Sequence, residues 1–200
     1  MDTGAKNWDD FILSNYPRKV TVGDVKGWLA DTDRKAKGEI IDFIYHRLHH
    51  RYLVPLSYIP REFKSGFLMM ASACLMIETI EAFRNGLKET PDGKARETFK
   101  AFFEREKDLF PGLAADATNF YRKVRCGILH QAETKGGYRI LRRGQLFDAP
   151  NKTIDANKFI RALTKALDRY VGELRKSDDD SSLWQNALKK VKFISDNCQN

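Results

Sequence analysis

The strongest constraint on the fold is one helical, almost wholly apolar stretch between residues 61 and 85. Its apolar side chains nearly surround the helix axis over the middle turns, which is typical of a helix buried on all sides. The longest apolar run, Gly66–Ile77, is twelve residues long and too short to cross a bilayer. We therefore expect this stretch to be the central helix of a bundle, ended by Gly86.

Apolar residues recur at helical spacing along most of the remaining chain, for example between residues 33 and 52 and between 111 and 131. The pattern changes after Gly136–Gly137, where apolar residues around a turn indicate one small β-hairpin. The sequence therefore predicts an all-α fold, a helical bundle of six to seven helices with one small β-hairpin after the 111–131 helix. Two hundred residues favour a single helical domain over 1–200.

The positive charge of the chain is unevenly placed. There are 35 Lys+Arg against 27 Asp+Glu, and the stretch Tyr121–Arg143 holds seven basic residues against one acid, Glu133. A local excess of this kind attracts polyanions such as RNA, DNA or phosphorylated ligands, although basic residues also simply keep proteins soluble. The residues of this stretch that we expect to bind nucleic acid are Arg122, Lys135, Arg139, Arg142 and Arg143.

The cysteines and the N-terminus point to the cytosol. The three cysteines are far apart and lack C-x-x-C spacing, which argues against a disulfide framework and against a cysteine zinc site. Met1–Asp10 is polar and lacks the apolar core of a signal peptide. Phosphate-loop, dinucleotide-loop and nucleophile-elbow motifs are absent from the sequence. We expect a cytoplasmic protein with no cofactor and no membrane partner.

Two segments carry histidines that bear on chemistry. In the first, Asp42, His46 and His50 follow at i, i+4 and i+8 and share one helix face. A carboxylate with two imidazoles can bind zinc or another divalent ion. The alternative is a solvated basic face, since Arg47 and Arg51 lie beside them and the sequence names no fourth ligand. A metal-dependent enzyme is the third hypothesis.

The second segment places Arg125 five residues before His130 within the most basic part of the chain. Histidine exchanges protons near neutral pH, and a guanidinium holds a phosphate bidentately and stabilises its transition-state charge. Together they suffice to cleave RNA without metal. On an ideal helix the two side chains diverge by about 140°. Arg125 must therefore reach round, Gly127 must permit a distortion, or a second subunit must complete the site. The alternative is a structural histidine near a helix end with an ion-paired arginine.

Three further side chains are candidates to support this pair. Glu78 lies on the apolar central helix, where a carboxylate is costly unless it is paired. It would orient Arg125 or His130 from a neighbouring helix, or form a structural ion pair. Tyr121 and Lys123 would contact RNA, or simply cover the helix that carries the pair.

The pattern Arg125-Cys-Gly-Ile-Leu-His130, near the end of a long helix in an all-α chain, resembles the R-x4-H signature of HEPN domains. These are helical bundles of defence, toxin–antitoxin and RNA-processing systems. Many are metal-independent endoribonucleases whose arginine and histidine meet in a cleft between two subunits. The resemblance implies a homodimer that acts on RNA, with Arg125 binding phosphate and His130 as general acid/base. It also implies a neutralising or regulatory protein partner.

The resemblance covers a HEPN-like core over residues 61–175 and leaves 1–60 as an N-terminal helical extension and 181–197 as a C-terminal helix. Two positions depart from the family pattern. The residue after the arginine is commonly asparagine in the family but is Cys126 here, and the tyrosine two residues after the histidine in one toxin subset is Ala132. Cys126, together with the lack of other clear active-site residues, favours the alternative of a non-catalytic HEPN-like module that binds RNA or a protein partner, and Ala132 argues against regulation by modification of that tyrosine.

Overall fold

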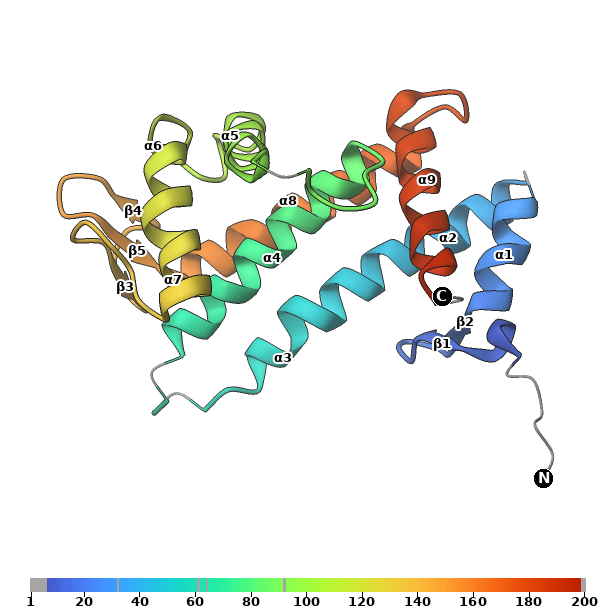
Figure 1. Ribbon diagram of the computed structural model, residues 1–200, viewed down its shortest axis with the longest axis horizontal. Helices are drawn as coiled ribbons and strands as arrows, with labels where there is room; N and C mark the ends of the chain where they lie inside the picture. The colour runs from blue at the N-terminus through green and yellow to red at the C-terminus, as the bar shows by residue number, and fades with distance from the viewer. Residues whose placement is uncertain (1–6, 32, 61, 64, 92, 199–200) are drawn as a thin grey trace. The chain divides into compact units, whose positions relative to one another are not determined.

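The computed structural model groups the chain into two compact units (Figure 1). The residues that it describes are 7–31, 33–60, 62–63, 65–91 and 93–198. Unit 1 consists of residues 1–50, 82–88 and 171–200, and unit 2 of residues 51–81 and 89–170. The single helical domain over 1–200 stays a prediction.

Unit 1 is built on the mutual packing of α1 (Val22–Ala30), α2 (Arg34–Leu48) and α9 (Ser182–Asp196). Helix α1 begins at Thr21 because the Thr21 side chain and the Asp24 carboxylate cap each other's backbone N–H groups. Before α1 come a short 3-10 helix, η1 (Trp8–Asp10), and the antiparallel strands β1 (Ile12–Ser14) and β2 (Val20–Thr21). The core of this unit is therefore a small three-helix cluster beside a two-stranded ribbon.

Unit 2 contains the remaining elements. Helix α2 continues through the π-helix η2 (His49–Leu53) into α3 (Val54–Ser57), and α4 spans Gly66–Arg84. Helix α5 (Ala95–Arg105) packs on α6 (Leu113–Asn119), which continues through the π-helix η3 (Phe120–Arg125) into α7 (Cys126–Gln131). Figure 1 shows α6 and α7 as parts of one rod. Helix α8 spans Ala156–Lys176.

A cluster of phenylalanines forms the core of unit 2. The rings of Phe120 and Phe159 are stacked with centroids 5.6 Å apart, and the ring of Phe103 meets that of Phe120 edge-on at 5.0 Å. Phe99 and Phe110 complete the cluster, and all five side chains are fully buried. Because Phe120 is the first residue of η3, this cluster fixes the position of the helix that carries Arg125.

The small β-element after α7 has three strands: β3 (Arg139–Leu141), β4 (Phe147–Asp148) and β5 (Thr153–Asp155). Strand β5 lies between the others, antiparallel to β4 and parallel to β3. A hairpin with its turn at Gly144 would pair β3 with β4, but in the structure both strands pair with β5: β4 and β5 form the antiparallel pair, and β3 joins it as a parallel edge strand. Helix α7 ends before Gly136–Gly137, because Ala132 already has left-handed backbone angles (φ 56°).

The predicted mostly helical bundle with a small β-element is confirmed. If the runs α2–η2–α3 and α6–η3–α7 are each taken as one helix, the described residues form seven helices. Helix α4 is long and apolar enough to cross a membrane by length and composition alone, but 61% of its apolar window is buried inside the protein. This burial fits the predicted central helix.

Phe120→Ala should lower the free energy of unfolding by about 3–5 kcal/mol, because it removes a fully buried ring from the phenylalanine cluster. Urea denaturation followed by circular dichroism measures the change. Phe63→Ala is the matched control, since Phe63 is 61% exposed and its loss should cost less than about 0.5 kcal/mol. Equal effects of the two substitutions would contradict the assignment of Phe120 to the core.

Candidate active site

The rod α6–η3–α7 is held in unit 2 by a stripe of buried apolar side chains. The members of this stripe recur every three or four residues, so they share one side of the rod. Arg125 and His130 lie on the flanks of this stripe, with Arg125 half-buried and His130 exposed. The buried members are Leu113, Ala117, Phe120, Val124 and Ile128.

The π-helix η3 widens the rod immediately before the Arg125–His130 segment. The N–H of Cys126 donates to the carbonyl oxygen of Tyr121, five residues earlier, instead of to the residue four earlier as in an α-helix. Arg125 is the last residue of this wide turn. Single π-helical turns inside α-helices are often found at functional sites, which makes η3 a structural marker for this region.

Arg125 joins Glu78 and His130 within one chain. Its Nε donates to Glu78 Oε1 at 2.8 Å, and its Nη2 donates to Oε2 at 3.2 Å. Its Nη1 lies 3.3 Å from His130 Nε2. The side chains of Arg125 and Glu78 are only 15% and 16% exposed. Of the three ways to bring Arg125 and His130 together, the structure has the first: the long arginine side chain reaches round the helix.

The contact between Arg125 and His130 places a cation beside the imidazole, with Nη1 of Arg125 3.3 Å from His130 Nε2. Burial acts to lower the pKa of Arg125, but the hydrogen bond and the charge of Glu78 outweigh it and raise that pKa. Arg125 is therefore a fixed cation beside an exposed histidine.

Tyr121 and Cys126 border this group. The guanidinium carbon of Arg125 lies 5.7 Å from the centre of the Tyr121 ring, within the range of a cation–π contact. Burial, together with a hydrogen bond to Cys126, raises the pKa of Tyr121, so its phenol is neutral near pH 7. The Cys126 thiol is half-buried.

Gly127 permits the close approach of the segment after α7. A Cβ added at Gly127 would lie 2.3 Å from the carbonyl oxygen of Glu133. The backbone of residues 133–135 therefore runs directly against the helix, and the N–H of Lys135 donates to the carbonyl oxygen of Lys123 at 2.9 Å. Gly127 is therefore needed where the chain folds back against the helix. The contact between Arg125 and His130 forms without a distortion of the helix at Gly127.

Six of the predicted site residues are cations that we expect to contact RNA besides Arg125. Three of these six lie around the turn that follows α7: Lys123, Lys135 and Arg139. The aliphatic part of Lys123 lies against Gly136, Lys135 begins the turn, and Arg139 opens β3. Tyr138 anchors the turn, because its hydroxyl donates to the Asp116 carboxylate on α6. These cations are therefore held close to the rod.

The other three predicted cations are Arg122, Arg142 and Arg143. Arg122 is exposed on η3, and Arg143 is exposed in the loop after β3. Arg142 is half-buried, and its Nη1 donates to the carbonyl oxygen of Phe63 at 3.1 Å. The stretch that is basic in sequence thus forms more than one cluster in space.

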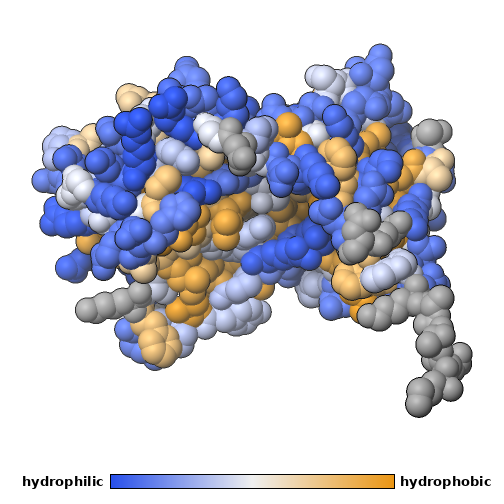
Figure 2. Space-filling view, viewed as in Figure 1, coloured by the Kyte–Doolittle hydropathy of each residue, from blue (hydrophilic) through white to orange (hydrophobic). Residues whose placement is uncertain are grey.

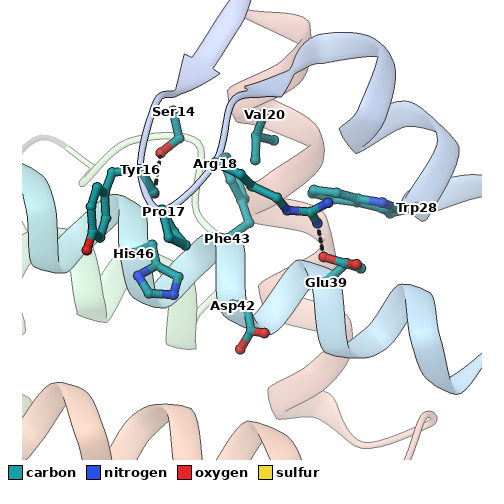
Figure 3. A pocket seen from close by; sticks show the side chains of 10 residues that line it. All are labelled: Ser14, Tyr16, Pro17, Arg18, Val20, Trp28, Glu39, Asp42, Phe43 and His46. Atoms are coloured by element: carbon teal, nitrogen blue, oxygen red, sulfur yellow. Dashed lines mark hydrogen bonds and ion pairs between the residues drawn. The ribbon is translucent and has the colours of Figure 1, made fainter.

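The other histidine segment lies in unit 1, where Figure 3 shows Asp42 and His46 on α2 beside the hairpin residue Tyr16. The Asp42 carboxylate accepts a hydrogen bond from Arg175 at 2.7 Å, and the His50 ring lies 4.0 Å from the Tyr16 ring. Burial lowers the pKa of both imidazoles. Within the described ranges, no group of three or more His, Cys, Asp or Glu residues is placed to hold a metal ion. The geometry thus gives no support to the metal-dependent hypothesis.

One cation near the rod was not among the predicted site residues. Lys152 lies outside the basic stretch, yet its Nζ donates to the carbonyl oxygen of Gly136 at 3.0 Å. The pairing of β3 with β5 brings it there. Its place near the rod could be predicted from the sequence only by predicting that β3 pairs with β5.

Comparison of the chain with protein-family models, with curated proteins and with solved structures gave no match. The site therefore has to be interpreted from its own geometry.

Gly127→Ala should destabilise the protein by more than about 1 kcal/mol, since its Cβ would meet the backbone of Glu133. Gly172→Ala in α8 is the matched control, because an added Cβ there meets no atom within 4 Å. That control should raise stability by about 0.5–1 kcal/mol, as expected for alanine in a helix. Thermal unfolding of both variants gives the comparison, and a stable Gly127→Ala protein would refute the close approach.

Proposed function

We propose that this protein is a metal-independent endoribonuclease of HEPN type that acts as a homodimer. The observation that carries the proposal is the three-residue group in which Arg125 is held by Glu78 and contacts His130. A charged guanidinium beside an imidazole supplies the two functions that phosphodiester cleavage requires, charge stabilisation and proton transfer. No step of this scheme needs a metal ion.

In the proposed reaction the 2′-hydroxyl oxygen of the substrate attacks the adjacent phosphorus, and the bond from phosphorus to the 5′ oxygen breaks. The products are a 2′,3′-cyclic phosphate and a free 5′-hydroxyl. The imidazole of His130 takes the proton of the 2′-hydroxyl while water protonates the 5′ oxygen, or the protonated imidazole delivers its proton to the 5′ oxygen while water takes the proton of the 2′-hydroxyl. Arg125 donates to the non-bridging oxygens, on which charge accumulates in the transition state.

Glu78 acts in this scheme as a positioning residue. Its two oxygens bind Nε and Nη2, which fixes the plane of the guanidinium and uses two of its five N–H donors. The remaining nitrogen, Nη1, contacts the imidazole of His130, which is the group that transfers protons in this scheme. A phosphate that enters between Arg125 and His130 would replace that contact with hydrogen bonds to both side chains.

An exposed apolar surface on α4 supports the homodimer. Leu68 and Leu75 are 57% and 45% exposed and lie two helical turns apart on one face. Glu78 follows Leu75 by three residues, so this face leads to the site. Figure 2 shows apolar surface over the first part of α4. Contiguous exposed apolar side chains mark interaction surfaces, and a second copy placed here would bring two Arg125–His130 pairs together.

One observation favours the alternative of a non-catalytic module that binds RNA or a protein partner. Arg125 is only 15% exposed and already has a bidentate ion pair, as in a structural network that links two helices. In that case the basic residues around the rod would bind RNA without cleaving it. Binding without cleavage by the wild-type protein separates this function from the first.

Cleavage should persist in EDTA and fall by at least about 100-fold in Arg125→Ala and in His130→Ala, the scale expected when a general acid/base or an oxyanion donor is lost. The measurement uses a pool of single-stranded and structured RNA, with product ends identified by mass spectrometry. Arg161→Ala, an exposed arginine on α8, is the control and should retain wild-type cleavage. Full activity in either site variant, or products with 5′-phosphate ends, would refute the mechanism.

Leu75→Asp should convert the dimer into monomers and lower cleavage in parallel, because it places a charge on the proposed interface. Light scattering after size exclusion measures the mass. Phe11→Asp in unit 1 is the matched control, since Phe11 is 49% exposed and lies on no surface assigned to the dimer. A Leu75→Asp protein that stays dimeric, or a monomer with full activity, would contradict the proposed homodimer.

A further inference from the structure

The turn after α7 gathers cations that come from separate parts of the sequence. Lys123 comes from η3, Lys135 from the turn itself, Arg139 from β3 and Lys152 from the segment before β5. The Nζ of Lys152 donates to the carbonyl oxygen of Gly136 at 3.0 Å. The backbone N–H of Arg139 donates to the carbonyl oxygen of Lys152 at 2.9 Å. Backbone and side-chain contacts thus hold these cations in one cluster.

The conformation of the turn keeps this surface open. Gly136 and Gly137 both have positive φ, 62° and 81°, and the N–H of Tyr138 donates to the carbonyl oxygen of Lys135 at 3.3 Å. This is the tight turn that two glycines form without strain. Both glycines are exposed and lack side chains, so a ligand can approach their backbone closely.

The two lysines Lys123 and Lys152 flank the turn. A Cβ at Gly136 would lie 3.3 Å from Lys123 Cδ, and one at Gly137 would lie 3.8 Å from Lys152 Cδ. The aliphatic parts of both side chains therefore lie against the glycines, which limits their freedom. A cation held in this way loses less entropy when it binds an anion than one on a free side chain.

Few carboxylates oppose these cations. The nearby acids are Glu133, Asp148 and Asp155 in sequence, and Asp116 through its hydrogen bond from Tyr138. Asp155 is buried and accepts hydrogen bonds from the backbone N–H groups of Asn157 and Lys158, and Asp116 also accepts one from Asn119. The Asp148 carboxylate accepts hydrogen bonds from the Asn151 side chain and backbone at 2.9 and 3.1 Å, and these hydrogen bonds lower its pKa. Glu133 is exposed. The cluster thus keeps a positive excess that favours a phosphate group.

The cluster lies next to the proposed catalytic group. Lys123 precedes His130 by seven residues, about two helical turns, so the two side chains share a side of the rod and lie about 10 Å apart along its axis. The N–H of Lys135 donates to the carbonyl oxygen of Lys123 at 2.9 Å, so the turn runs alongside the same part of the rod. A nucleic-acid strand whose scissile phosphate contacts His130 would therefore pass within reach of these lysines.

We infer that Lys123, Lys152 and the Gly136–Gly137 turn form a second phosphate-binding site for RNA, which holds a backbone phosphate next to the one that is cleaved. The inference rests on the proposed function and deepens it, because it names Lys152 as an RNA-binding residue and requires a substrate longer than two nucleotides. Contacts to a phosphate carry no base preference, so this site positions RNA without selecting its sequence.

The test is the salt dependence of RNA binding. Fluorescence anisotropy with a labelled single-stranded RNA gives the binding constant at several salt concentrations. The slope of the logarithm of the binding constant against the logarithm of the salt concentration should be smaller in magnitude by about 0.7 in Lys152→Gln than in wild type. Lys123→Gln should lower it by a similar amount. Lys152→Arg keeps the charge and should keep the wild-type slope. Lys165→Gln on α8 is the matched control, an exposed lysine remote in sequence, and should also keep it.

Cleavage supplies a second, independent readout. A dinucleoside monophosphate has only the scissile phosphate, so the loss of kcat/KM in Lys152→Gln should be several-fold larger on a longer RNA than on the dinucleotide. If wild type cleaves neither substrate but the binding slopes still depend on Lys152, the ribonuclease proposal fails and the phosphate site stands. If Lys152→Gln and Lys165→Gln have the same slope, the phosphate site is refuted whatever the activity.

Discussion

The ion pair between Glu78 and Arg125 links the apolar helix α4 to the rod that carries the site. Both side chains are mostly withdrawn from water, and removing either would leave the other as an uncompensated charge beside an apolar helix. The pair therefore determines where the guanidinium lies, and through it the contacts with His130 and with the Tyr121 ring. The geometry of the candidate site depends on this one interaction more than on any local property of the Arg125–His130 segment.

Some of this arrangement could be predicted from the sequence because it follows from short-range rules. The periodicity of apolar residues gave the helices, and the cost of an unpaired carboxylate on an apolar helix pointed to Glu78 as the partner of a cation. The contact of Arg125 with His130 is harder to predict from the sequence, because an ideal helix separates the two side chains and the reach of a flexible side chain depends on its neighbours. The parallel pairing of β3 with β5 joins segments that are not adjacent in the sequence, so short-range rules do not predict it. The position of Lys152 depends on this pairing and could not be predicted either.

The two units differ in what their polar groups do. In unit 1 the histidines of α2 lie among aromatic rings, and Asp42 is engaged by Arg175, so these groups serve packing and ion pairing. In unit 2 one rod combines a fixed cation, an imidazole and nearby lysines. Burial of a phenylalanine cluster against the same rod provides the rigidity that a site of this kind needs.

The π-helix η3 has a consequence for how such a chain tolerates insertions and deletions. A wide turn holds one more residue than an α-helical turn, so the extra residue adds almost no rotation to the helix that follows it. Loss of one residue from η3 would therefore restore a regular helix and leave the direction of α7 about unchanged, whereas loss of one residue from α6 would rotate everything beyond it by about 100°. The spacing of arginine and histidine would be the same in both cases, yet only the second change would turn both side chains in another direction. The two-residue motif is thus meaningful only together with the length of the helix before it.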